Sequence, residues 1–240
     1  MKKYPIVSFL LLFFLLDSYS KITILIPTLA DETNVPQLSG NWIRGDFVGL
    51  GESGDIDPRI LTQEGKRRWD TYNFKVDDPS YKCIPASWTR VWLNPNVVVK
   101  ISQTDDEVRL KYEFMDLDRV IPLGDPVNQS VERFNTKGIP TLGYSFAWYE
   151  GGTLVIDTIN ISRGYISTIA DWAGLPQSQF MHTVERISKS KDMLNIEITH
   201  DDPIIFNQPF VVTISYALTD YQLMKYDCDP EEASIVEPNS

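Results

Sequence analysis

The sequence is poor in the residues from which most metal centres and disulfide-rich folds are built. Its 240 residues include only two cysteines and two histidines. Two cysteines exclude a zinc site with four cysteine ligands and a small fold held by many disulfides. Two histidines exclude a metal centre with three histidine ligands. We therefore predict a protein without a metal site and without a cofactor.

Basic residues are also scarce, with 22 Lys and Arg against 33 Asp and Glu and a formal net charge of −11. A nucleic-acid-binding protein needs a basic surface to neutralise phosphates, so this balance argues against such a partner. The hydrophobic content of 42% and the aromatic content of 12% are sufficient for a real core. The chain length fits one large domain.

Long hydrophobic runs are absent after the N-terminus. Lys2 and Lys3 precede an apolar run over residues 6–16, and Ser18 and Ser20 supply the small residues of a cleavage site. This is the layout of a secretory signal peptide, and the run is shorter than the roughly 20 residues of a membrane-spanning helix. We expect residues 1–20 to be removed, which places the protein in the periplasm or outside the cell without stable membrane insertion. A retained anchor is the alternative, because residues 22–26 are mostly apolar.

Export changes the interpretation of the cysteines. Cys83 and Cys228 both lie in the mature chain, where an oxidising compartment favours one long-range disulfide between them. A reactive catalytic cysteine is the alternative, although neither residue has a histidine close in sequence.

Along the mature chain we expect an extended segment over residues 21–37, one domain over 38–230 and a tail over 231–240. The best helix candidate covers residues 61–69, with Thr62 as its N-cap and Glu64 in the first turn. From residue 91 onward, apolar and polar residues alternate with a period of two, which is typical of half-buried strands.

The alternation predicts four hairpins, at 97–102/108–114, 144–149/153–159, 182–188/194–200 and 210–218/222–227. Consecutive hairpins form an antiparallel meander, and a long meander must close or stack to hide its edges. We predict an all-β fold, a lipocalin-like barrel with one or two short helices; a β-sandwich is the alternative. The irregular segment 164–179 is a candidate lid over a barrel mouth.

Several motifs resemble those of a group of exported, mostly uncharacterised bacterial proteins. Residues 38–42 (LSGNW) resemble the group's LxGxW opening, and 143–158 resemble its GHSxGxWEGDTLVVDT hairpin. Further matches lie around Cys83, at His182 (HTVER) and at Cys228 (YDC), so the likeness spans about residues 38–230. The resemblance implies export and a shared scaffold for both cysteines, and implies no particular activity. The group's histidine in the GHS segment is Tyr144 here, so a catalytic role at that position is either carried by Tyr144 or lost.

Known hydrolase and nucleotide-binding motifs are missing: we find no G-x-S-x-G, no H-E-x-x-H and no phosphate loop.

His182 and Arg186 lie on the same face of one predicted strand. If this face is turned into the barrel, the two side chains can act as a general base and an oxyanion partner. If it is turned outward, both side chains are solvated. Asp157 lies in an apolar strand, where a carboxylate is either exposed or placed in a cavity with a raised pKa.

We therefore name His182, Tyr144 and Asp157 as candidate catalytic residues. The candidate ligand-binding residues are aromatic or cationic side chains of the predicted barrel, with Arg90 and Arg119 as possible partners for Asp157: Trp42, Arg90, Arg119, Trp148 and Arg186. An aromatic-lined barrel favours binding of a small hydrophobic or aromatic molecule in an internal pocket. The alternatives are a cofactor-independent isomerase, cyclase or lyase that uses the same pocket, and a structural surface protein without a ligand.

Overall fold

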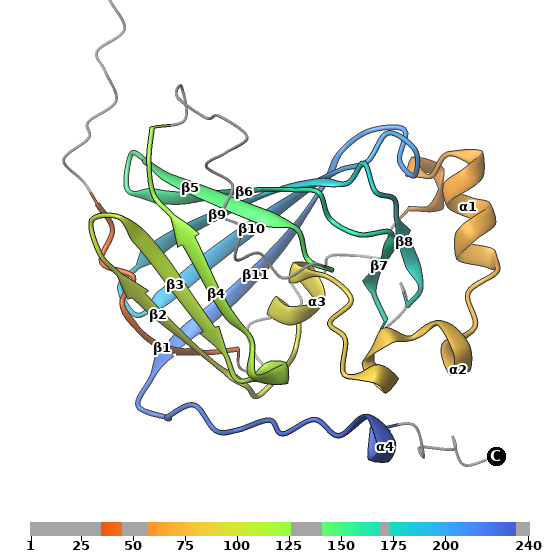
Figure 1. Ribbon diagram of the computed structural model, residues 1–240. Helices are drawn as coiled ribbons and strands as arrows, with labels where there is room; N and C mark the ends of the chain where they lie inside the picture. The colour runs from red at the N-terminus through yellow and green to blue at the C-terminus, as the bar shows by residue number, and fades with distance from the viewer. Residues whose placement is uncertain (1–34, 45–56, 126–140, 169–172, 234–240) are drawn as a thin grey trace, which may run out of the picture.

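A computed structural model gives the arrangement of the chain, and it describes residues 35–44, 57–125, 141–168 and 173–233 (Figure 1). The expected signal peptide and most of the expected N-terminal segment lie outside these residues. Within the described residues, one antiparallel sheet holds nine strands in the order β4-β3-β2-β1-β11-β10-β9-β6-β5. The strands are β1 (Gly40–Ile43), β2 (Val98–Gln103), β3 (Glu107–Tyr112), β4 (Asp118–Pro122), β5 (Tyr144–Glu150), β6 (Thr153–Ile159), β9 (His182–Ser190), β10 (Met193–Asp201) and β11 (Phe210–Thr219).

The sheet curves until its two edge strands approach each other. Strands β4 and β5 meet at one isolated bridge, Leu123 to Ala147, where the Gly124 amide donates to the Ala147 carbonyl at 3.0 Å. Strands β1 and β11, which are far apart in sequence, pair in the middle of the sheet. The predicted all-β barrel architecture is confirmed, and the barrel is joined between β4 and β5 by this bridge instead of a continuous ladder.

Short helices lie beside the barrel, and one of them, α3, lies within it (Figure 1). They are η1 (Pro58–Ile60), α1 (Gln63–Asp70), α2 (Phe74–Asp77), η2 (Pro79–Lys82), α3 (Trp88–Trp92), η3 (Phe114–Asp116) and α4 (Pro230–Ala233). The predicted helix with its Thr62 cap is confirmed as α1, because Thr62 Oγ1 accepts from the Gly65 amide at 3.0 Å. No helix in the described ranges is both long enough and apolar enough to cross a membrane.

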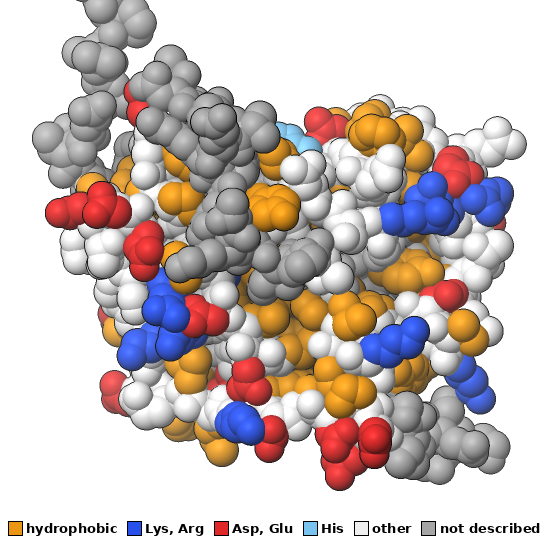
Figure 2. Space-filling view, in the orientation of Figure 1, with side chains coloured by type: hydrophobic (Ala, Val, Ile, Leu, Met, Phe, Trp, Pro, Cys, Tyr) orange, Lys and Arg blue, Asp and Glu red, His pale blue; other side chains and the backbone are white. Residues whose placement is uncertain are grey.

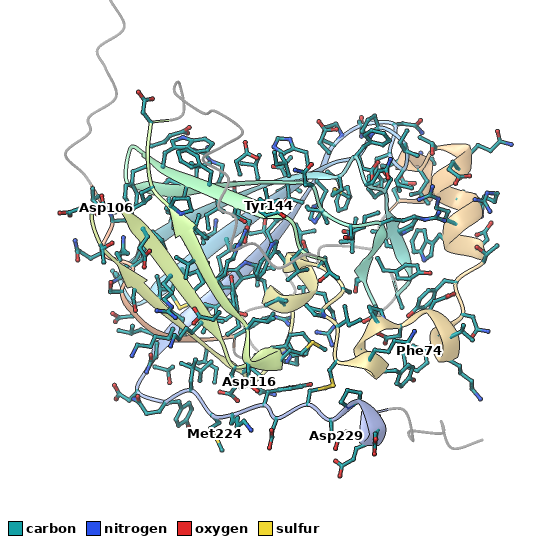
Figure 3. The ribbon with its side chains drawn as sticks, viewed as in Figure 1. Phe74, Asp106, Asp116, Tyr144, Met224 and Asp229 are labelled. Atoms are coloured by element: carbon teal, nitrogen blue, oxygen red, sulfur yellow. A yellow bond between two sulfur atoms is a disulfide. The ribbon has the colours of Figure 1, made fainter. Side chains whose placement is uncertain are left out.

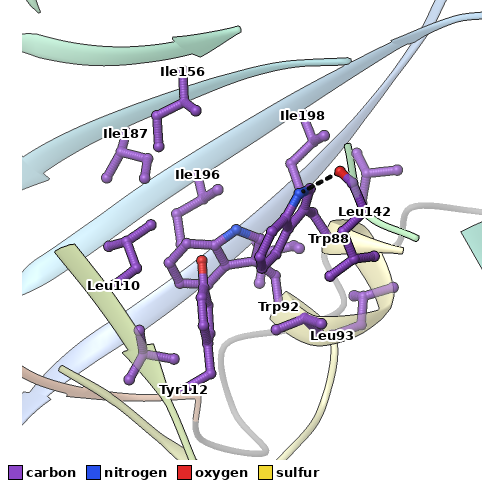
Figure 4. Close-up of a cluster of buried hydrophobic side chains, with 14 of the residues drawn as sticks. Trp88, Trp92, Leu93, Leu110, Tyr112, Leu142, Ile156, Ile187, Ile196 and Ile198 are labelled. Carbon is purple, nitrogen blue, oxygen red and sulfur yellow. Dashed lines mark hydrogen bonds between the residues drawn. The ribbon is translucent and has the colours of Figure 1, made fainter. Parts of the chain in front are cut away.

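Helix α3 fills the barrel. Trp92 is fully buried and Trp88 nearly so, and both indoles lie among the inward-facing side chains of β3, β6, β9 and β10 (Figure 4). Trp88 Nε1 donates to the Leu142 carbonyl at 3.0 Å, and Trp92 Nε1 donates to the Glu185 carboxylate at 2.6 Å. Tyr216 Oη donates to the Trp92 carbonyl at 2.7 Å. The interior is therefore occupied by a segment of the chain itself.

The segment predicted as the last strand, 222–227, is not a strand. Strand β11 already pairs with β10 on one side and with β1 on the other, so it offers no free edge to a hairpin partner. Residues 220–229, here called the C-terminal strap, instead cross the end of the barrel and are fixed by the Cys83–Cys228 disulfide. The predicted disulfide is confirmed.

The segment predicted as an irregular lid also contains regular structure. Strands β7 (Gly164–Ser167) and β8 (Leu175–Gln177) form a separate two-stranded sheet that packs beside α1 and α3. Gly174 has a φ of +79°, and a Cβ at this position would lie 2.2 Å from the Tyr72 ring. A glycine is therefore required where β8 begins.

Candidate functional site

His182 and Asp157 form a hydrogen-bonded pair on the outer face of the sheet. They lie on neighbouring strands β9 and β6, where Asp157 is opposite Val184, and His182 Nε2 lies 2.7 Å from Asp157 Oδ1. The His182 side chain is 41% exposed and that of Asp157 is 18% exposed. The hydrogen bond to Asp157 raises the pKa of His182 against the opposing effect of partial burial. The pair can therefore hold and release a proton at a site that solvent reaches.

Three further side chains surround this pair on the same face. Trp148, Val155 and Arg186 form one row across β5, β6 and β9. Trp148 Nε1 donates to Glu150 Oε1 at 2.6 Å, and Arg186 Nη1 lies 2.9 Å from Glu150 Oε2. These contacts lower the pKa of Glu150, the hydrogen bond from Trp148 being the larger cause.

Tyr144 begins β5 (Figure 3), in register with Ile159 of β6, and shares the face of Trp148 by the alternation of the strand. Five of the predicted residues thus lie on one side of three adjacent strands, here called the outer-face cluster: Tyr144, Trp148, Asp157, His182 and Arg186. His182 and Arg186 therefore lie on the outward face of their strand and do not point into the barrel. Sequence reasoning missed Glu150, which it assigned to a turn, although strict alternation from Trp148 places it on this face.

Arg119 lies on the opposite, inner face and is 4% exposed. Its Nη2 lies 2.6 Å from Glu185 Oε2, and it also donates to Ser145 Oγ at 2.8 Å and to Thr158 Oγ1 at 3.0 Å. Burial acts to lower the pKa of Arg119, but the adjacent Glu185 carboxylate raises it overall. Arg119 therefore pairs with Glu185 and not with Asp157, and Glu185 is a second residue that sequence reasoning missed.

The other two predicted ligand-binding residues are engaged elsewhere. Trp42 is fully buried and donates from Nε1 to the Leu38 carbonyl at 2.8 Å. Arg90 donates to Asn94 Oδ1 at 3.0 Å and places its guanidinium 5.0 Å from the centre of the Phe114 ring. Neither belongs to the outer-face cluster, because Trp42 points into the core and Arg90 lies on α3.

His200 ends the predicted strand 194–200, and it is buried inside the barrel within β10. Its Nε2 lies 2.7 Å from Thr89 Oγ1, and its ring stacks on Phe210 with centres 4.5 Å apart. Burial lowers the pKa of His200 to about 4. The ring therefore stays neutral in mildly acidic solution, where an exposed histidine becomes protonated.

One small enclosed space lies inside the barrel, within the described part of the chain. It has a volume of ≈ 10 Å³ and is lined by side chains of α3, β8, β9 and β10, including Thr89, Thr183 and His200. That volume holds about one water molecule. The described residues contain no group of three or more His, Cys, Asp or Glu side chains that could hold a metal ion.

Comparisons with known proteins assign neither a family nor a function to this chain. No family model matches the sequence, and no curated protein does. Among solved structures, the fluorescent protein UnaG is similar at 16% identity and a TM-score of 0.34, over 76% of this chain and 97% of that chain. A secretary abundant heat soluble protein from Ramazzottius varieornatus is similar at 10% identity and a TM-score of 0.38, over 77% and 96% of the two chains. Likenesses this distant carry no argument about function.

Proposed function

We propose that this protein is an exported β-barrel protein that binds a small hydrophobic or aromatic molecule, and that the ligand binds at the outer-face cluster. The observation that carries the proposal is that Trp148, Arg186, Asp157 and His182 gather on one face of β5, β6 and β9. Export rests on the signal-like N-terminus and agrees with the disulfide.

The cluster combines the features of a small-molecule site. The half-buried Trp148 ring offers a flat apolar surface, while Phe146 and Val155 on the same face are buried and only support it from below. His182 and Arg186 supply hydrogen-bond donors that are 41% and 40% exposed. A few polar groups beside apolar side chains fix the orientation of a ligand.

The barrel interior is a poorer candidate, although an internal pocket was the initial expectation. Helix α3 occupies it, and its two indoles are held by hydrogen bonds to Leu142 and Glu185. A ligand would have to displace both rings and leave the buried Glu185 carboxylate without one of its donors, which is energetically expensive.

A thermal-shift screen of small aromatic and apolar compounds tests the proposal. A ligand at about 100 times its Kd adds about 2.7 kcal/mol to the free energy of unfolding, which raises Tm measurably. We expect Trp148→Ala and His182→Gln to abolish the shift, because both side chains lie in the cluster. Phe74→Ala removes an exposed aromatic ring on α2 and is the matched control. This variant should still show the ligand-induced rise in Tm. The absence of any stabilising compound, or a shift that survives in both cluster variants, would contradict the proposal.

The second candidate function is cofactor-independent acid–base catalysis at the same cluster, as an isomerase, cyclase or lyase. The specific observation is the 2.7 Å contact between His182 Nε2 and Asp157 Oδ1. A carboxylate that fixes an imidazole leaves the other ring nitrogen available for proton transfer. Tyr144 shares this face and would be the acid, while His182 would be the base.

Asp157→Asn tests the electrostatics of the pair directly. We expect the pKa of His182 to fall in this variant, because the asparagine cannot stabilise the imidazolium. A histidine with a raised folded-state pKa stabilises the protein below its unfolded pKa, and this contribution disappears as pH rises through the folded pKa. The variant should therefore lose stability relative to the wild type at about pH 5 and not at about pH 9. Histidine NMR titration and denaturation at both pH values check this; an unchanged His182 pKa would refute the coupling.

A further inference from the structure

A groove separates the C-terminal strap from the outer face of β2 and β3, on a part of the molecule that the proposed function does not use. The strap is held in place by the main-chain amides of Tyr226 and Asp227, which donate to Asp116 at 3.0 and 3.1 Å. Figure 3 shows Asp116 at the end of the β3–β4 hairpin facing the strap segment that carries Met224. The groove has a volume of ≈ 420 Å³, within the range of small-molecule sites.

The sheet side of the groove carries two lysines, Lys100 and Lys111, beside two aspartates, Asp116 and Asp118. Lys100 of β2 and Lys111 of β3 lie directly opposite each other in register, and both are exposed. Like charges at directly opposed positions of an antiparallel pair destabilise the sheet. Figure 2 shows basic and acidic side chains interleaved over β2–β4. An anion placed between the two ammonium groups would convert this repulsion into two attractions.

The carboxylates near the groove are already engaged. Asp118 accepts a bidentate ion pair from Arg109, and Lys111 reaches it only at 3.9 Å. Asp116 accepts hydrogen bonds from the strap amides, and these bonds lower the pKa of Asp116, with the bond from Tyr226 contributing most.

The charged groups nearest to Lys100 are also engaged or lie in another groove. Lys225 pairs with Asp227 on the strap. Glu107 lies beside Lys100, Arg109 and Lys111 in an adjoining groove of ≈ 300 Å³. Lys100 has no ion-pair partner in the described portion of the chain.

The groove also has an apolar component. Leu117 and Leu223 line it from the sheet side and from the strap, and both are half-buried. A bare inorganic anion would leave these side chains without a contact, whereas a molecule with an apolar part would cover them.

We propose that this groove binds a small molecule that carries a phosphate or sulfate group, bound between Lys100 and Lys111, and an apolar group, which packs on Leu117 and Leu223. A tetrahedral oxyanion offers several acceptor oxygens and can bridge two ammonium groups whose strands lie about 5 Å apart. The groove lies on β2, β3 and the strap, so this site is independent of the outer-face cluster.

Fluorescence titration of the full mature chain with 1-naphthyl phosphate tests the proposal. We expect saturable binding that weakens with salt, that inorganic phosphate competes away and that 1-naphthol does not reproduce. Lys100→Gln and Lys111→Gln should each weaken binding roughly fivefold or more, because each removes a charge-assisted hydrogen bond. Lys75→Gln on α2 makes the same change of charge elsewhere and should leave the affinity unchanged.

Three results would overturn the proposal. The first is the absence of saturable binding, and the second is equal affinity in the wild type and in both groove variants. The third is binding to vesicles that contain phosphatidylglycerol without binding to the soluble phosphate, which would identify a lipid surface as the partner instead.

Discussion

Arg119→Met is expected to lower the free energy of unfolding by about 3 to 5 kcal/mol, because it leaves the Glu185 carboxylate buried without its cation. Glu185 is fully buried, and its described partners are Arg119 and the Trp92 indole. Methionine roughly preserves the volume of the arginine side chain, so the loss reports on charge and not on a cavity. Urea denaturation of the purified variant measures it.

Two variants make this result interpretable. Arg119→Met combined with Glu185→Leu should recover most of the lost stability, because the double change removes both buried charges. Arg109→Met breaks the exposed ion pair with Asp118 and should cost less than about 1 kcal/mol. A loss below about 1 kcal/mol in Arg119→Met itself would contradict a stabilising role for the buried pair with Glu185.

Removing the Cys83–Cys228 disulfide is expected to have the second large effect. The bond joins residues 145 positions apart, so it restricts the unfolded chain strongly, and its loss should cost about 2 to 5 kcal/mol. Cys83→Ser combined with Cys228→Ser is the variant to measure, since it leaves no unpaired thiol.

The same variant has a local consequence that distinguishes strap release from global destabilisation. The amides of Tyr226 and Asp227 should exchange hydrogen much faster, whereas those of β10 should change only in proportion to the global stability. If the strap amides keep their protection, the bonds to Asp116 hold the strap without the disulfide, and the expected loss of order is wrong.

Seven strands of the large sheet, the capped helix and the disulfide could be predicted, because each depends on short-range pattern or on one pair of residues, whereas β1 and β4 were not predicted. Alternation fixed the relative faces of His182, Arg186 and Glu185, but not which face points inward. Val155 and Ile159 flank Asp157 on the outer face, so both faces of β6 are largely apolar. The usual rule that the apolar face is buried therefore could not predict which face points into the barrel.

The content of the interior could not be predicted for a different reason. Helix α3 has only five residues and lies in the long connection between β1 and β2, with no periodicity that indicates insertion into a barrel. The partner of Arg119 is 66 residues away, and only the closed arrangement of β4 and β9 brings the two together. An aromatic-rich barrel therefore proved to be filled by its own tryptophans.

The central claim is that a ligand binds on the outer face and not inside the barrel, and the two histidines report on these two places. His182 lies in the outer-face cluster, whereas His200 lines the small interior cavity. The most direct measurement is the NMR shift of both imidazole rings during titration with a compound that stabilises the protein. We predict that the His182 signals move with saturation while those of His200 stay in place. Movement of the His200 signals with a static His182 would place the ligand in the interior and contradict the account.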